Sequence, residues 1–151
     1  MEMQDSVHRF FHDLSLNELQ LMNRESGYPN ITYNSLLYLD LIYYRKSCTA
    51  SELAKLLHIS KAAVTAKLNE LIRQGFVVKR QNAQDKRRYD LSVSPDMEKI
   101  YRRFDKRLLT AFEQIERQFT REQMDCFCKV LAVLDRFYME EADDEQTVKN
   151  L

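Results

Sequence analysis

The chain has 151 residues, of which 44% are hydrophobic and 30% charged, and its 23 cationic and 23 anionic side chains give a formal net charge of zero. This composition is typical of a folded protein of about one domain and excludes wholesale disorder. No stretch approaches the roughly 18 apolar residues of a membrane span, and no secretion signal is recognisable at the start. We therefore expect a cytoplasmic protein with no membrane partner.

Three cysteines, Cys48, Cys126 and Cys128, have neither the number nor the spacing of a disulfide framework or a metal motif. We expect reduced thiols that pack as small hydrophobic side chains, and no cofactor. A redox-sensing role for Cys48 is the alternative, because this residue falls in a loop between two expected helices.

The first expected element is a helix from Val7 to Met22, in which apolar residues follow helical spacing. The segment SGYPN breaks this helix. Thr32 can then cap a second helix, which runs to about residue 45 and is apolar nearly all round. Such a helix is expected to be buried.

A helix-turn-helix is predicted next. Thr49 or Ser51 can cap a short helix over residues 52–57, and Ser60 can cap a longer helix that stops at a glycine. About three residues join the two helices, and we expect Ile59 to pack inside the turn. This spacing is typical of helix-turn-helix motifs.

The longer helix of this pair has two different faces. Its apolar stripe contains Val64, Leu68, Leu71 and Ile72, which we expect in the core. The opposite stripe lacks the Lys and Glu of an ordinary solvated face and holds Ala62, Thr65, Ala66, Asn69 and Arg73. Small residues allow close approach to a DNA groove, and Thr, Asn and Arg can reach base edges or phosphates. For this helix alone, an ordinary amphipathic helix with a few alanines is the alternative.

A β-hairpin is expected directly after this helix. Residues 76–81 are rich in β-branched side chains, and Tyr89, Leu91 and Val93 alternate with polar residues. The polar turn between the strands ends in three consecutive cations, Lys86, Arg87 and Arg88. A helix-turn-helix followed by a hairpin is a winged helix, so the cations lie on the wing.

Two long helices complete the chain. The first has Ser94 as its cap, Pro95 at its first position and one apolar stripe as far as Phe119. Thr120 and Gln123 form a capping box that opens the last helix. These stripes hold more apolar surface than a small winged helix needs, and a monomer would expose them. We therefore expect a homodimer, which would present two recognition helices to half-sites about 34 Å apart.

The cations are concentrated in the winged helix. Residues 61–90 contain eight Lys and Arg against three acids, whereas residues 140–145 contain five acids. We expect this acidic end to be frayed. A local basic patch is the electrostatic feature that matters for binding nucleic acid, whatever the net charge.

The order of these elements resembles the MarR family of bacterial transcription regulators over nearly the whole chain. The fragments SELAKLL, VTAKLNELIRQGFVVKR and DKR (Asp85-x-Arg87) stand where this family carries its recognition-helix and wing signatures. The resemblance implies a fold that is mainly α with a small β-hairpin wing. It also implies three parts: an N-terminal dimerisation helix (1–31), a winged helix-turn-helix DNA-binding region (32–94), and C-terminal dimerisation helices with the acidic tail (95–151).

The resemblance further implies a repressor that binds double-stranded DNA at a palindromic operator. In the expected complex, Ala62, Thr65, Ala66 and Asn69 face the major groove, while Ser60, Lys61, Lys67 and Arg73 hold phosphates. The wing cations Lys86, Arg87 and Arg88 meet the adjacent minor groove. Asp85 either pairs with Arg87 or caps the turn. A solvated charge run is the alternative for the wing. Many members of the family have an arginine where this chain has Ala66, so no base preference is carried over.

The family commonly responds to small aromatic or phenolic ligands, which would release the DNA. The residues expected to line such a cleft are Phe10, Phe11, Tyr38, Tyr43 and Tyr44, with ordinary core packing as the alternative. His8 and His12, one helical turn apart, leave a metal-responsive variant open. A winged helix that binds only protein is a further alternative. No phosphate-binding loop or nucleophile motif is present, so we expect no enzyme.

Overall fold

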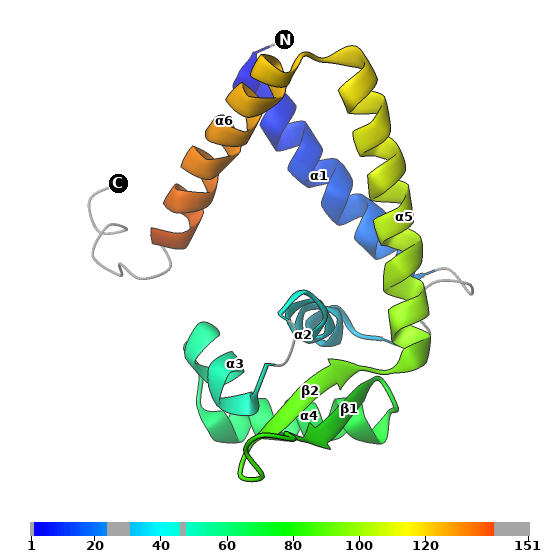
Figure 1. Ribbon diagram of the computed structural model, residues 1–151, viewed down its shortest axis with the longest axis vertical. Coiled ribbons are helices and arrows are strands. Elements are labelled where there is room, and N and C mark those ends of the chain that lie inside the picture. Colours follow the sequence, from blue (N-terminus) through cyan, green and yellow to red (C-terminus); the bar gives the residue numbers. More distant parts are fainter. Residues whose placement is uncertain (1, 24–30, 46–47, 141–151) are drawn as a thin grey trace. The chain divides into compact units, whose positions relative to one another are not determined.

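The computed structural model describes residues 2–23, 31–45 and 48–140. Two compact units divide the chain, Met1–Arg103 and Phe104–Leu151, and helix α5 runs across their boundary. Figure 1 shows the elements in chain order: α1 (Met3–Met22), α2 (Tyr33–Tyr44), α3 (Ala50–Leu56), α4 (Lys61–Arg73), β1 (Val77–Gln81), β2 (Tyr89–Val93), α5 (Pro95–Gln118) and α6 (Arg121–Glu140). The predicted fold class, mainly α with one β-hairpin, is confirmed. None of the described helices is long and apolar enough to cross a membrane.

Helix α2 supplies the centre of the core in the first unit. Thr32 caps it as predicted, with its Oγ1 atom accepting a hydrogen bond of 3.2 Å from the backbone N–H of Ser35. Leu36 and Leu39 are fully buried. The predicted burial of this helix is confirmed for the side that faces the core, whereas Tyr33 and Leu37 on another side are exposed.

The helix-turn-helix forms from local capping signals, as the sequence indicates. Thr49 and Glu52 make a reciprocal capping box at the start of α3, and the Ser60 hydroxyl accepts from the N–H of Ala63 at the start of α4. Leu53 of α3 and Leu71 of α4 are fully buried between the elements. These contacts fix the direction in which α4 presents its outer face.

The turn between α3 and α4 differs from the prediction. His58 has a positive φ of 51°, and the side chain of Ile59 is 42% exposed instead of packed inside. The backbone N–H of Ile59 bonds back to the carbonyl oxygen of Ala54 at 3.2 Å. The turn is therefore closed by the backbone around a left-handed residue, and it directs the Ile59 side chain outward.

The hairpin has the predicted pairing. Strands β1 and β2 are antiparallel, with Val77 opposite Val93 and Lys79 opposite Leu91. Leu91 also forms a bridge to Cys48, whose carbonyl oxygen accepts from the N–H of Leu91 at 2.9 Å. The segment before α3 thus holds the base of the wing.

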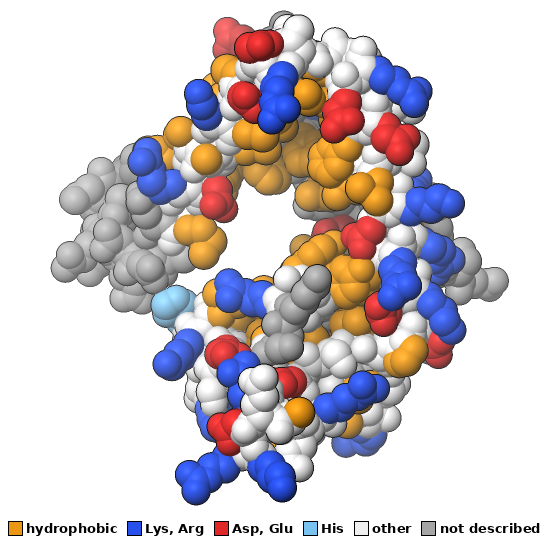
Figure 2. All heavy atoms as spheres, viewed as in Figure 1, with side chains coloured by type: hydrophobic (Ala, Val, Ile, Leu, Met, Phe, Trp, Pro, Cys, Tyr) orange, Lys and Arg blue, Asp and Glu red, His pale blue; other side chains and the backbone are white. Residues whose placement is uncertain are grey.

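The long helices carry the apolar stripes that the sequence predicts. In α5, Met97 and Tyr101 are buried within the first unit, whereas Phe112 in the second unit is 48% exposed. The Thr120–Gln123 capping box at the start of α6 is present in both directions. Several large apolar side chains of α1 and α6 are also exposed, and hydrophobic atoms are visible along α5 and α6 in Figure 2. The acidic end beyond Glu140 lies outside the described residues.

Candidate nucleic-acid interface

A groove of about 360 Å³ lies where α4, the start of α3 and the hairpin meet. Its lining contains four cations and no acid, and consists of Thr49, Ala50, Ser51, Lys61, Thr65, Leu68, Asn69, Ile72, Lys79, Arg87, Arg88, Tyr89 and Leu91. Figure 2 shows Lys and Arg side chains gathered at the wing end of this unit. The groove therefore joins the recognition helix and the wing into one surface, whose positive charge comes from Lys61, Lys79 and Arg87, since Arg88 is paired with acids outside the lining.

Most of the residues predicted on the outer face of α4 are exposed together: Ser60, Lys61, Ala62, Thr65, Ala66, Asn69 and Arg73. Thr65 and Asn69 both line the groove, one helical turn apart. The Thr65 hydroxyl donates to the carbonyl oxygen of Lys61 at 2.7 Å, which holds its methyl group in a fixed position. This face offers small side chains, an amide and cations, but no large apolar residue.

Lys67 differs from the other predicted phosphate contacts. Its side chain is 14% exposed, and its Nζ atom lies 3.0 Å from Oε1 of Glu70. Lys67 is therefore paired with an acid one turn farther along α4 and is largely covered, whereas Lys61 and Arg73 remain exposed.

The turn of the wing is organised by its own polar side chains. Asn82 Oδ1 accepts from the backbone N–H groups of Gln84 and Asp85, at 2.8 and 3.0 Å. Asp85 Oδ1 accepts from the backbone N–H of Arg87 at 2.9 Å, so Asp85 caps the turn. Of the two roles that the sequence left open for Asp85, the structure describes the cap.

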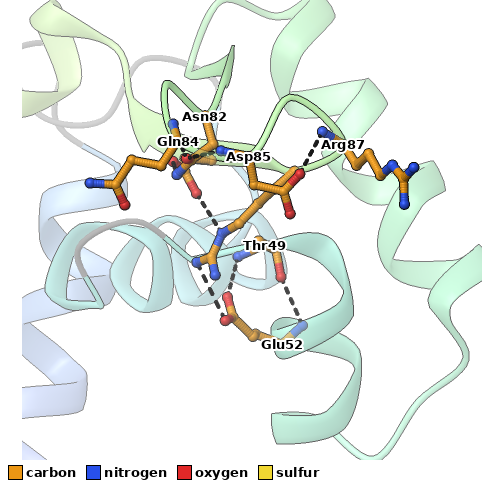
Figure 3. A network of polar contacts seen from close by, with 8 residues as sticks. Thr49, Glu52, Asn82, Gln84, Asp85 and Arg87 are labelled. Atoms are coloured by element: carbon orange, nitrogen blue, oxygen red, sulfur yellow. Dashed lines mark hydrogen bonds and ion pairs between the residues drawn. The ribbon is translucent and has the colours of Figure 1, made fainter.

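Arg87 and Arg88 are neighbours in sequence with different surroundings. Figure 3 shows the side chain of Arg87 extending away from Thr49, Glu52 and the turn. Within the described part of the chain, its guanidinium makes no hydrogen bond or ion pair. The guanidinium of Arg88 instead lies 3.0 Å from Oδ1 of Asp90 and 3.5 Å from Oε1 of Glu52.

The carboxylates around Arg88 stay ionised. Hydrogen bonds from the backbone and side chain of Thr49 lower the pKa of Glu52. Hydrogen bonds from Asn82 and Arg88 lower the pKa of Asp90, and those same carboxylates raise the pKa of Arg88. All three groups are therefore charged near neutral pH.

Two residues of this surface, Lys79 and Tyr89, were not predicted. The Lys79 ammonium lies 4.6 Å from the centre of the Tyr89 ring, over its face. The hairpin register makes these residues diagonal neighbours, since Lys79 is opposite Leu91 and Gln81 is opposite Tyr89. Only an exact register reveals this pair, and the alternation of apolar residues alone does not.

The aromatic residues predicted to line a ligand cleft fall into separate groups. Phe10 and Phe11 lie on α1 with their ring centres 6.1 Å apart. Tyr43 stacks on Tyr101 at 4.2 Å, and Tyr44 meets both rings edge-on. Tyr38 is buried, and its burial raises the pKa of its hydroxyl.

The residues considered for sensing are dispersed. Among the described residues no cluster of three or more His, Cys, Asp or Glu could hold a metal ion, and Nδ1 of His12 lies 3.1 Å from Asp13. Cys48 is buried, and burial raises the pKa of its thiol, which disfavours the reactive thiolate. Cys126 and Cys128 are exposed on α6.

Comparison with known proteins gives one family. The model of the MarR family matches residues 31–89, which include α2, α3, α4 and β1. Residues 31–89 are a MarR family region. The predicted family is thus confirmed on the segment that forms the candidate interface. A comparison with curated protein sequences finds no match.

Solved structures with a similar fold include MarR-type regulators. FabT of Streptococcus pneumoniae in complex with DNA has a TM-score of 0.63 at 22% identity, over 91% of this chain and 98% of its own. An S. aureus MepR variant bound to an oligodeoxyribonucleotide has a TM-score of 0.53 at 17% identity, over 91% and 99%. S. aureus MepR bound to ethidium bromide has a TM-score of 0.52 at 19% identity, over 87% and 95%. At these identities the likeness shows a shared fold, which extends well beyond the MarR family region.

Proposed function

We propose that this chain is a transcriptional regulator that binds double-stranded DNA through α4 and the wing. The observation that carries the proposal is the groove, whose lining combines the outer face of the recognition helix with four cations and no acid. In the proposed complex, this face meets the major groove, and Lys86 and Arg87 of the wing enter the adjacent minor groove. FabT, which has a similar fold, was solved in complex with DNA, and this supports DNA as the partner of this chain. The proposed function is binding, without catalysis.

We further propose that the chain acts as a homodimeric repressor. Exposed large apolar side chains on α1, α5 and α6 support the dimer, because monomeric proteins seldom leave such surface in water. Two copies related by a two-fold axis would match a palindromic operator, with half-sites about one helical turn apart. Repression follows if that operator overlaps a promoter.

Release by a small aromatic or phenolic ligand completes the proposed function. The rings of Tyr43, Tyr44 and Tyr101 form a cluster on α2 and α5 that offers stacking partners. MepR bound to ethidium bromide is a similar fold holding an aromatic cation. A ligand that binds only the conformation unable to hold DNA would shift the population away from the operator complex.

The proposed function is tested with the DNA upstream of the protein's own gene. Labelled duplexes are titrated with the protein at several salt concentrations, beside a duplex of scrambled sequence. We expect tighter binding to the upstream duplex and a linear fall of log affinity with log salt. Equal affinity for both duplexes, or affinity that does not change with salt, would contradict the proposal.

The contribution of α4 is tested by changing one groove residue. Asn69→Ala should alter which base pairs are preferred, with a discrimination loss of about 1–3 kcal/mol for the base it contacts. Arg73→Ala should weaken binding to all sequences alike, because a phosphate contact carries no sequence information. Selection of binding sites from a random duplex pool distinguishes the two outcomes.

A further inference from the structure

Arg88 is the cation of the wing that the structure surrounds with acids. Asp90, two residues along the chain in β2, lies 3.0 Å from its Nε atom through Oδ1. Glu52, at the start of α3, lies 3.5 Å from its terminal nitrogen. Two carboxylates and one guanidinium carry a net charge of minus one, so this cluster has no net positive charge to attract a phosphate.

These contacts belong to a continuous chain of polar bonds from the wing turn to α3, seen in Figure 3. At one end, Asn82 accepts from two backbone N–H groups of the turn and donates through Nδ2 to Asp90 Oδ2 at 2.6 Å. Arg88 links Asp90 to Glu52. At the other end, the second oxygen of Glu52 accepts from the N–H of Thr49 at 2.7 Å, in the capping box of α3.

The wing needs such a connection, because a two-stranded hairpin has little stability of its own. Its base is held by the backbone bridge between Leu91 and Cys48. Beyond that bridge, the pair Arg88–Glu52 joins the outer part of the hairpin to α3. Exposed ion pairs add little to folding stability, so the effect of this pair lies in placement.

We propose that Arg88 is a positioning residue, which holds the wing against α3 through Glu52 and Asp90 so that Arg87 reaches the DNA. This inference rests on the proposed function and divides its wing cations by role. Arg87 extends away from the network and offers its charge to the minor groove, while Arg88 is satisfied within the protein. The position of the wing on DNA then depends on Glu52, an acid whose own charge is repelled by the DNA phosphates.

This arrangement gives Glu52 an effect of unexpected sign. Removing an acid near a phosphate surface ordinarily strengthens DNA binding, because a repulsion disappears. If Glu52 anchors Arg88, its removal frees the wing and weakens binding instead. Glu52→Gln is the suitable change, since glutamine can keep the capping box with Thr49 while it loses the charge.

The experiment is a double-mutant cycle on the full chain. Wild type, Glu52→Gln, Arg88→Ala and the double variant are titrated against the labelled upstream duplex at one salt concentration. We expect Glu52→Gln alone to weaken binding roughly two- to fivefold, the range of an exposed ion pair. In the Arg88→Ala background, the same change should not weaken binding and should strengthen it slightly, because only the repulsion is left to remove.

The reversal of sign decides the inference. The inference is wrong if Glu52→Gln strengthens DNA binding, or leaves it unchanged, in the protein that retains Arg88. It is also wrong if Glu52→Gln weakens binding equally with and without Arg88. Glu98→Gln is the matched control, because Glu98 pairs with Arg102 on α5, and it should leave affinity unchanged. Equal thermal melting of wild type and Glu52→Gln verifies that the cap is intact. If wild type itself shows no salt-dependent binding, the proposed function fails; if it binds and the reversal is absent, only the role of Arg88 fails.

Discussion

Helices α4 and α6 are both amphipathic, but they differ in what covers their apolar side. Leu71 of α4 is fully buried by its own unit, whereas Phe127 of α6 is 61% exposed in the single chain. Helix α5 combines both conditions, with Tyr101 buried near its start and Phe112 exposed farther along. The same sequence signal therefore marks an internal core in one region and an exposed apolar surface in the other, which a second chain would cover in the proposed dimer.

The largest expected effect comes from removing a side chain of the internal core. Leu71→Ala should lower the free energy of unfolding by about 2–5 kcal/mol, because it leaves a cavity between α4 and its neighbours. Thermal or denaturant unfolding measures this loss. If Leu71 belongs to a core within one chain, the loss should be the same at all protein concentrations.

The next effect concerns the exposed region. Phe127→Ser should raise the dissociation constant of the dimer about tenfold or more, because each subunit loses apolar area at the interface. Sedimentation velocity over a range of concentrations measures the change. Ile59→Ser, which alters an exposed apolar residue in the α3–α4 turn, serves as the control and should leave association unchanged. If the wild-type protein stays monomeric at all concentrations, the exposed apolar side of α6 is not a dimer interface.

The smallest effect concerns the covered start of α5, where the Tyr101 hydroxyl donates to Oδ1 of Asp40 at 2.5 Å. Burial raises the pKa of Asp40, and Glu18 raises it further, although the bond from Tyr101 lowers it. The fold thus favours the protonated carboxyl, so Asp40 costs stability at pH values above its raised pKa. Asp40→Asn should therefore slightly raise Tm at neutral pH, and its advantage should shrink as pH falls through that pKa.

For Asp96 we expect the opposite change in Tm when the carboxylate is replaced by an amide. Its hydrogen bond and charge interaction with Lys99 lower its pKa, so the ionised form stabilises the fold at neutral pH. Asp96→Asn should slightly lower Tm at neutral pH, and the difference should fade on acidification. Melting curves of both variants between neutral pH and about pH 4 compare the two carboxyls. An Asp40→Asn protein that is less stable at neutral pH would contradict the burial of this group.

Local features of this fold were predictable from the sequence. Thr32, Ser60 and the Thr120–Gln123 pair cap their helices because capping depends on residues three apart in the chain. The hairpin followed from the alternation of Tyr89, Leu91 and Val93. The winged helix and its family could thus be inferred from the order and spacing of the residues alone.

Features that depend on a side-chain rotamer, on an unusual backbone conformation or on distant residues could not be predicted in this way. The covering of Lys67 by Glu70 is a choice of side-chain rotamer on one helix turn. The Arg88–Glu52 pair joins positions 36 residues apart in sequence, and the folded distance between α3 and the wing decides it. The outward direction of Ile59 follows from the positive φ of His58, which propensities for this residue type do not require.

The most direct test of the central claim is the salt dependence of DNA binding by Arg87→Ala. Its affinity for the upstream duplex is measured over a range of salt concentrations, beside wild type and Arg102→Ala. Arg102 is a matched arginine on α5 that pairs with Glu98 outside the groove. If the wing holds DNA through Arg87, its removal should weaken binding to all sequences and reduce the slope of log affinity against log salt by about 0.9, while Arg102→Ala leaves the slope unchanged. An Arg87→Ala protein with the affinity and slope of wild type would contradict the assignment of the wing as a DNA-binding element.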